Sequence, residues 1–160
     1  MMLNDRTEYQ QCYACGMRNA HGLHMEFRIE EDTIVSDFQP ETYHQGFPGV
    51  LHGGIVSALM DEVLNRTSLL ADHPQWTMTG RLEIRFRRQV PCGPLLRLRA
   101  KLDKQRGRMF QASGTLTLAE DESIILVEGQ GAFMALSDDM VQSLLQEYPG
   151  FVAGMEGEEP

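Results

Sequence analysis

One apolar stretch, residues 53–71, constrains the fold more than any other part of the chain. A helix built from it would be apolar on more than one side, and such a helix is buried inside a protein. The apolar positions of the stretch are Ile55, Val56, Ala58, Leu59, Met60, Val63, Leu64, Leu69 and Leu70. Because Pro74 follows soon afterwards and proline cannot continue a helix, the helix must end near Ala71. The rest of the chain must therefore supply what covers it.

The segments on either side of this stretch have the alternating pattern of β-strands. Residues 22–39 predict a hairpin, and residues 77–136 predict a series of long strands with turns near 91–94, 104–107 and 120–122. Long strands joined by short turns form an antiparallel sheet. A flat sheet cannot bury a helix on all sides, so either the sheet wraps around the helix or a second copy of the chain covers the remainder. The predicted fold class is α+β.

The length of 160 residues fits a single domain. We divide the chain into an N-terminal segment with a Cys-x-x-Cys turn (1–22), a main domain (23–137), and a short helix with an acidic tail (138–160). No window approaches the roughly eighteen apolar residues of a membrane span, so no membrane association is expected. With no secretion signal at the N-terminus and three cysteines, we expect a cytoplasmic protein with reduced thiols.

The charge of the chain is unevenly distributed. The net charge is -9, which argues against nucleic acid as a partner, yet ten of the fourteen basic residues lie between positions 81 and 108. A local basic field in an acidic protein suits a small anionic ligand. The alternative is that these arginines form the solvated face of strands, and the periodicity alone favours this for most of them.

Two glycines, Gly53 and Gly54, open the predicted helix. Glycine is a poor helix former, so a pair of them at a helix start makes sense where something must approach the backbone closely. The free N–H groups of a helix N-terminus could hold a thioester carbonyl and stabilise the oxyanion formed when that carbonyl is attacked. A loop-to-helix turn that merely needs glycine's conformations is the alternative.

Two carboxylates, Asp61 and Glu62, lie midway along the apolar helix. Carboxylates are rarely buried without a partner or a function. Burial would raise the pKa of Asp61 toward the range useful for a general base. The alternative is a structural ion pair, for which Arg66 is placed four residues after Glu62.

The spacing of these groups predicts a site shared by two chains. His52, immediately before the glycines, and Asp61 are nine residues apart, about two and a half helical turns or roughly 13 Å. They would lie on opposite sides of the helix and could not easily act on one carbonyl within one chain. If both are catalytic, the helix start of one subunit meets Asp61 of another, and the protein is a dimer.

Several motifs resemble those of one family. They are Cys12-Tyr13-Ala14-Cys15-Gly16, Asn19, Gly22-Leu23, His44-Gln45-Gly46, Pro48-Gly49, His52-Gly53-Gly54, Leu59-Met60-Asp61-Glu62, Thr79-Gly80-Arg81-Leu82, Phe86, Val90-Pro91-Cys92-Gly93 and Gly107-Arg108. Together they make the chain similar to hotdog-fold acyl-CoA thioesterases of the PaaI-like group, in the 4-hydroxybenzoyl-CoA thioesterase superfamily. The resemblance implies an antiparallel sheet wrapped around one long central helix. It also implies a homodimer with active sites at its interface, often paired into a homotetramer, and no cofactor.

The resemblance also implies roles for single residues. Asp61 corresponds to the catalytic acid, which acts as base on water or as nucleophile, and the N–H groups of Gly53 and Gly54 polarise the thioester carbonyl. His52 and Gln45 orient that carbonyl, and the Thr79 hydroxyl holds water or the acid. The candidates for binding the acyl-CoA substrate are Glu62, Arg87, Arg88, Arg106 and Arg108.

Other interpretations stay open. A non-catalytic acyl-CoA-binding or ligand-sensing protein could share the fold, although a binder has no need of a half-buried base. A dehydratase or hydratase is a third possibility, but its Asp–His spacing is not found here. Four side chains with the ligand chemistry of zinc also lie close together in sequence, at spacings shorter than those of zinc fingers, and we assign no metal. They are Cys12, Cys15, His21 and His24.

Overall fold

The computed structural model describes residues 11–148. Its elements run in the following order: β1 (Arg28–Glu30), β2 (Thr33–Phe38), the 3-10 helix η1 (Thr42–His44), β3 (Gln45–Phe47), β4 (Val50–Leu51), α1 (Gly53–Asn65), the 3-10 helix η2 (Arg66–Leu70), β5 (Thr77–Phe86), β6 (Leu96–Arg106), β7 (Met109–Leu118), β8 (Asp121–Ala135) and α2 (Asp138–Glu147).

Six strands form one antiparallel sheet in the order β1-β2-β6-β7-β8-β5. The antiparallel arrangement predicted from the short turns is thus confirmed. The hairpin predicted over residues 22–39 is shorter, because strand pairing begins only at Arg28. The alternation before it has another cause. Leu23 and Met25 are buried and donate backbone hydrogen bonds to the carbonyls of Tyr13 and Ala14, so this extended stretch packs on the N-terminal segment.

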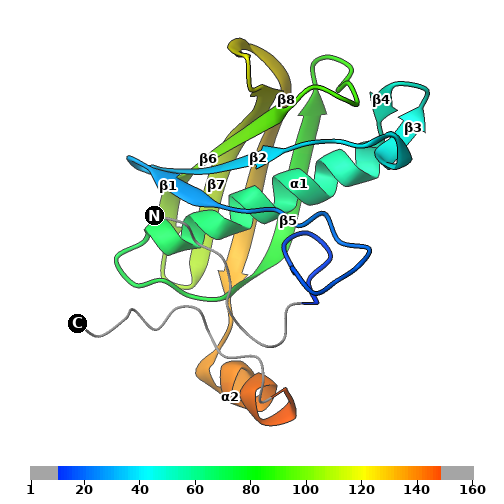
Figure 1. Cartoon of the computed structure of the whole chain (residues 1–160). Helices are drawn as coiled ribbons and strands as arrows, with labels where there is room; N and C mark the ends of the chain where they lie inside the picture. The colour runs from blue at the N-terminus through cyan, green and yellow to red at the C-terminus, as the bar shows by residue number, and fades with distance from the viewer. Residues whose placement is uncertain (1–10, 149–160) are drawn as a thin grey trace.

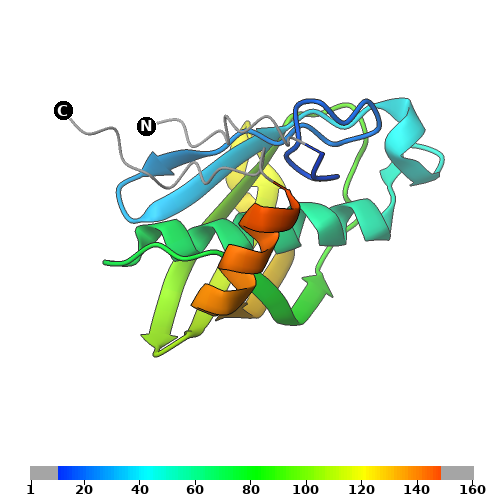
Figure 2. The same ribbon diagram turned by 90° about the horizontal axis from the view of Figure 1, so that it is seen from below.

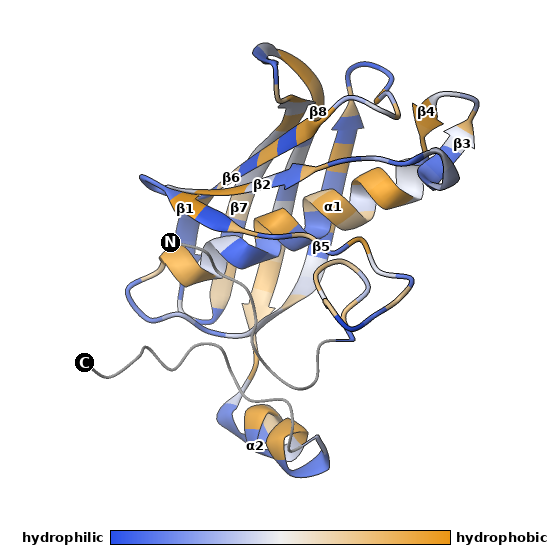
Figure 3. Ribbon diagram, in the orientation of Figure 1, coloured by the Kyte–Doolittle hydropathy of each residue, from blue (hydrophilic) through white to orange (hydrophobic). Residues whose placement is uncertain are grey.

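Helix α1 lies across one face of the curved sheet, which wraps partly around it (Figures 1 and 2). Its apolar side chains form the centre of the core, and several turns of α1 are orange in the hydropathy colouring (Figure 3). The fully buried residues of the helix are Val56, Leu59, Met60, Val63 and Leu64. Across from them, β7 and β8 contribute buried aromatic rings at Phe110 and Phe133. The prediction of one buried central helix is therefore confirmed.

The central helix changes from α-helix to 3-10 helix before its predicted end. Regular α-helix stops at Asn65, and the chain continues as η2 up to Leu70. The Thr67 hydroxyl donates to the Leu64 carbonyl at 2.7 Å, which satisfies one of the carbonyls left open at a helix C-terminus. The tighter turn also places Arg66 beside the N-terminal segment, where it contacts Phe27 and Cys15.

Basic side chains of β6 form an ion-pair ladder. Arg97 bonds to Asp37 and Glu122, and Arg99 bonds to Glu122 and Glu30, with N–O distances of 2.6 to 2.9 Å. Their neighbours Leu98 and Ala100 are buried, so the arginines alternate with core residues along the strand. This part of the basic segment is the polar face of a sheet, as the periodicity indicated.

The chain after the sheet forms α2, in the segment 138–160 for which a short helix was predicted. Ser137 caps it, because its hydroxyl oxygen accepts a hydrogen bond from the Met140 N–H. Among the helices of residues 11–148, none is long and apolar enough to cross a membrane.

Candidate active site

The N-terminus of α1 is closed by a histidine. His52 is the N-cap residue, and its Nδ1 accepts a hydrogen bond from the Gly54 N–H at 3.0 Å. Because Nδ1 is an acceptor, the proton of the neutral ring resides on Nε2. The His52 carbonyl accepts from the next two N–H groups, those of Ile55 and Val56. In this first turn, the Gly53 N–H therefore has no hydrogen-bond acceptor within the described residues.

The β3–β4 hairpin holds the loop before this helix. Gln45 Oε1 accepts a hydrogen bond from the Gly49 N–H at 3.1 Å, so the side chain spans its own turn. A Cβ at Gly46 would lie 3.2 Å from His52 Cδ2, so glycine lets the hairpin pack against the imidazole ring. Gln45, His52 and Gly53 are all exposed at this end of α1. The structure therefore brings the residues predicted for the helix start together.

Asp61, two turns further along α1, is paired with the predicted hydroxyl. Thr79 Oγ1 donates to Asp61 Oδ1 at 2.8 Å. Burial raises the pKa of the Asp61 carboxyl above its usual value; the Thr79 hydrogen bond opposes this, and the charge of Glu62 adds to it. A carboxylate with a raised pKa, oriented by a hydroxyl, is suited to accept a proton.

Glu62 makes different contacts from those of Asp61. Its carboxylate pairs with Arg66 at 3.1 Å, and Cys12 Sγ lies 3.9 Å from its Oε2. The ion pair with Arg66 was the structural alternative predicted from the four-residue spacing. A role for Glu62 in substrate binding stays a prediction.

The two halves of the predicted site lie far apart within one chain. A Cβ at Gly53 would lie 3.7 Å from the ring of Phe86, the last residue of β5, whereas Asp61 bonds to Thr79, near the first residue of that strand. Seven positions along a strand correspond to roughly 20 Å. One chain therefore does not bring the Gly53 N–H and the Asp61 carboxylate to the same atom.

Phe86 is the site neighbour that sequence analysis missed. It alternates with Leu82 and Ile84 along the strand, as a core residue would, yet its ring is half exposed beside the helix start. Strand β5 is at the edge of the sheet, and most of its residues are exposed. An aromatic residue at the end of an edge strand would have indicated this position. The sequence does not reveal which strand is at the edge, so this signal could not be used.

The four candidate arginines fall into two groups. Arg87 and Arg88 follow β5 at the helix-start end, whereas Arg106 and Arg108 flank the β6–β7 turn at the opposite end of the sheet. Arg87 is paired with Glu128, and Arg108 donates to the Ala135 carbonyl. The guanidinium groups of Arg88 and Arg106 have no partner within residues 11–148.

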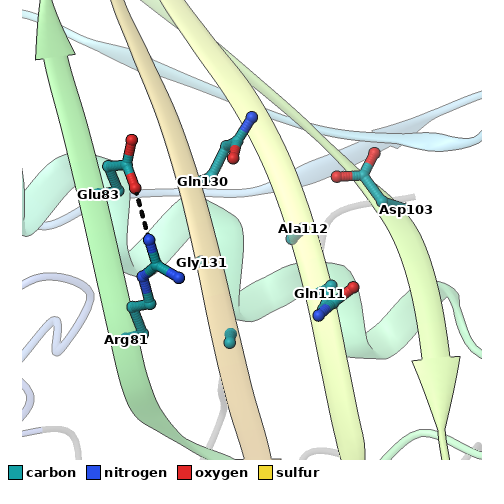
Figure 4. A pocket seen from close by; sticks show the side chains of 8 residues that line it. Arg81, Glu83, Asp103, Gln111, Ala112, Gln130 and Gly131 are labelled. Atoms are coloured by element: carbon teal, nitrogen blue, oxygen red, sulfur yellow. Dashed lines mark hydrogen bonds and ion pairs between the residues drawn. The ribbon is translucent and has the colours of Figure 1, made fainter.

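Two hollows on the surface of residues 11–148 differ in their lining. One, of about 320 Å³, is lined by Arg88, by Gly49 and Val50 of the β3–β4 hairpin, and by apolar residues of β7 and β8. The other, of about 220 Å³, lies on the sheet among polar side chains that include Arg81, paired with Glu83 (Figure 4). No predicted site residue lines the second hollow.

The cysteines and histidines of the N-terminal segment do not form one cluster. His24 Nε2 is hydrogen-bonded to the Asn19 carbonyl at 2.7 Å. Within the described residues, Cys12 and Cys15 are instead grouped with Glu62. The Cys-x-x-Cys segment is a tight turn with Cys15 half-buried.

Six antiparallel strands curved around one long central helix define a hotdog fold. The sequence profile of the Thioesterase superfamily matches residues 48–125, which include the helix start, Asp61 and Thr79. A solved thioesterase superfamily protein has a TM-score of 0.70 and 25% identity over 78% of this chain and 60% of its own. Residues 48–125 of this chain therefore match the thioesterase superfamily within a hotdog fold.

Similar curated proteins are acyl-coenzyme A thioesterases. Human THEM5 is 32% identical over 110 residues, which are 69% of this chain and 43% of that protein. Bovine THEM4 is 31% identical over 139 residues, which are 84% of this chain and 55% of that protein. The chain thus spans about half the length of these relatives.

Proposed function

We propose that the chain hydrolyses acyl-CoA thioesters to a free acid and coenzyme A. The observation that carries this proposal is the pairing of Asp61, half-buried in the central helix, with the Thr79 hydroxyl at 2.8 Å. A carboxylate so placed, with a pKa raised by burial, is suited to activate water. The similarity to proteins named acyl-CoA thioesterases supports the same substrate class.

The proposed site is completed by a second copy of the chain. Within residues 11–148, strand β5 is at the edge of the sheet and pairs only with β8, and edge strands pair readily with another chain. If two β5 strands pair antiparallel around a two-fold axis, Phe86 and Gly53 of one copy come to the Thr79 end of the other. Asp61 of one subunit and the Gly53 N–H of its partner then face one substrate.

In this arrangement the helix start and the Asp61 carboxylate act on different steps of the reaction. The Gly53 N–H and the positive end of α1 stabilise negative charge on the thioester oxygen as the carbonyl carbon is attacked. Asp61 accepts the proton of the attacking water, or attacks the carbon itself, while the Thr79 hydroxyl holds the carboxylate in place. Collapse of the tetrahedral intermediate breaks the C–S bond, and the departing thiolate of coenzyme A takes up the proton that Asp61 accepted from water. Where Asp61 itself attacks, water then hydrolyses the acyl anhydride on Asp61 to give the free acid, and a proton of that water goes to the thiolate. His52 and Gln45 fix the geometry of the loop that presents Gly53.

Arg88 is our candidate for the phosphates of coenzyme A. It lines the hollow beside the β3–β4 hairpin, and its guanidinium has no partner among residues 11–148. We expect Arg88→Ala to raise KM for acyl-CoA by about tenfold or more with kcat little changed, because a hydrogen bond to a charged group contributes about 1.5–3 kcal/mol. Steady-state kinetics test this, with Arg99→Ala as a control from the ion-pair ladder. An unchanged KM would remove Arg88 from the site.

The reaction itself is tested by following free thiol released from short, long and aromatic acyl-CoA esters. We expect turnover by the wild type, and a loss of roughly 10²- to 10⁴-fold in Asp61→Asn, because an amide cannot act as a base. Asp72→Asn makes the same change at an exposed position beyond the helix and should leave the rate unchanged. No thiol release from any ester by a folded wild-type protein would overturn the proposal and favour a ligand-binding role.

A further inference from the structure

The Cys-x-x-Cys turn packs against the end of the central helix. Its contacts with Glu62 and Arg66 have no role in the proposed hydrolysis. The Gly16 N–H donates to the Cys12 carbonyl at 2.9 Å, which closes the turn and directs both thiols toward Glu62. The two sulfur atoms and a carboxylate oxygen of Glu62 all lie within 4.8 Å of one another. In Figure 1 this segment is the blue loop beside α1.

A guanidinium group completes the cluster. Arg66 NH2 lies 3.0 Å from Cys15 Sγ, to which it donates, and 3.1 Å from Glu62 Oε1. Its guanidinium also stacks over the Phe27 ring, with 5.1 Å between Cζ and the ring centroid. The arginine is therefore held in place by three neighbours, and its positive charge opposes the other effects that raise the pKa of the adjacent Cys15 thiol.

The two thiols differ in exposure and in acidity. Cys12 is exposed, whereas Cys15 is half-buried. The Cys15 thiol donates to the Cys12 sulfur and so lowers the pKa of Cys12 to about 6, against the opposing effects of desolvation and of Glu62. The same hydrogen bond, together with burial and Glu62, raises the pKa of Cys15. The two shifts favour Cys12 as the sulfur that loses its proton first and Cys15 as the one that keeps its proton.

A metal fits this cluster less well. A zinc ion would need the negative charge of both cysteines and of Glu62, but the Arg66 guanidinium already occupies one sulfur and the carboxylate. Placing a divalent cation there would set two positive groups side by side. An accessible thiolate with a second thiol in reach is instead the arrangement of a redox-sensitive pair.

We propose that Cys12 and Cys15 form a reversible redox site that a hydroperoxide converts to a disulfide. The Cys12 thiolate attacks one peroxide oxygen, the O–O bond breaks, and a sulfenic acid forms while the departing hydroxide takes up a proton. Cys15 sulfur then attacks Cys12 sulfur and displaces hydroxide, which leaves as water with the Cys15 proton. The two cysteines lose two electrons, hydrogen peroxide gains them, and two waters are produced. A dithiol reverses the reaction by exchange.

The test counts free thiols on the full chain after brief exposure to hydrogen peroxide. We expect the three thiols to fall to one, a tryptic peptide in which Cys12 and Cys15 are linked, and full recovery with dithiothreitol. Cys15→Ser should leave a sulfenic acid on Cys12 that dimedone traps, whereas Cys12→Ser should react far more slowly. Cys92→Ser is the matched control and should form the same disulfide as the wild type.

Three results would overturn the proposal. The first is retention of all three thiols under conditions that oxidise a free thiol of ordinary acidity. The second is oxidation of Cys92 as fast as that of Cys12. The third is a tightly bound zinc ion, measured by metal analysis, that is lost in Cys12→Ser, because this would make the cluster a metal site. None of these measurements depends on thioester hydrolysis, so the redox site and the proposed function can fail separately.

Discussion

At the scale of single residues, the position of each acid on α1 decides its chemistry. Asp61 and Glu62 are adjacent, yet one is bonded to a hydroxyl and the other to a guanidinium. An ion pair with Arg66 satisfies Glu62, whereas Asp61 faces a neutral donor and keeps a pKa raised by burial. The same helix thus carries one carboxylate held in an ion pair and one that is suited to proton transfer.

The Thr79 hydrogen bond gives a prediction on pH dependence. The hydroxyl stabilises the charged form of Asp61 and so lowers its pKa against the effect of burial. Removing it in Thr79→Val should raise that pKa further, so the carboxylate is protonated over a wider acidic range. We expect the acid limb of the kcat/KM profile for acyl-CoA hydrolysis to move to higher pH. Thr79→Ser keeps the hydroxyl and should retain the wild-type profile; an acid limb that moves to lower pH in the valine variant would contradict the assignment.

At the scale of elements, glycines set how closely strands and helix approach. A Cβ at Gly114 on β7 would lie 2.6 Å from the Arg99 carbonyl oxygen on β6, where backbone meets backbone. A Cβ at Gly129 on β8 would lie equally close to Met60 Cε, the end of a flexible side chain. The first contact can be relieved only by moving a strand, whereas the second can be relieved by a side-chain rotation.

These two glycines provide a matched pair of variants. We expect Gly114→Ala to lower the free energy of unfolding by about 1–3 kcal/mol, the usual cost of overpacking. Gly129→Ala should lower it less, because the Met60 side chain can move aside. Urea unfolding curves of the two variants measure the difference. A larger loss in Gly129→Ala would show that the helix–sheet contact is the more rigid of the two.

The sequence predicted the helices and strands better than it predicted the contacts between them. Periodicity identified α1, the four long strands and α2, because each has a clear apolar pattern. It placed the buried residues Leu23 and Phe27 in a hairpin strand, because extended chain packed on another segment has the same alternation as a strand. It could not show that Phe86 lies at a sheet edge or that Arg66 reaches Cys15, because both depend on contacts between distant segments.

At the scale of the whole molecule, the two halves of the proposed site lie at separate positions along the central helix. The Gly53 N–H lies at the Phe86 end of β5 and the Asp61 carboxylate at the Thr79 end. Two copies related by a two-fold axis at β5 would form two complete sites from four half-sites. The exposure of Thr79, which is bonded to a half-buried acid, fits an opening that faces another subunit.

Two variants remove one half-site each. Asp61→Asn removes the base. Gly53→Pro removes the free N–H at the first position of a helix, where proline is well tolerated, and the extended backbone of His52 suits a residue before proline. Gly53→Ala keeps the N–H and has room for its Cβ, so it should stay active. Each of the first two variants alone should be nearly inactive toward acyl-CoA.

The most direct test of the shared site is to unfold and refold Asp61→Asn and Gly53→Pro together in equal amounts and measure thioester hydrolysis. Half of the dimers would then contain one chain of each kind, and one of their two sites would have both an intact helix start and an intact Asp61. We expect recovery of about one quarter of the wild-type activity. If the mixture is no more active than the separate variants, although mixed dimers are present, the site does not combine Gly53 of one chain with Asp61 of the other.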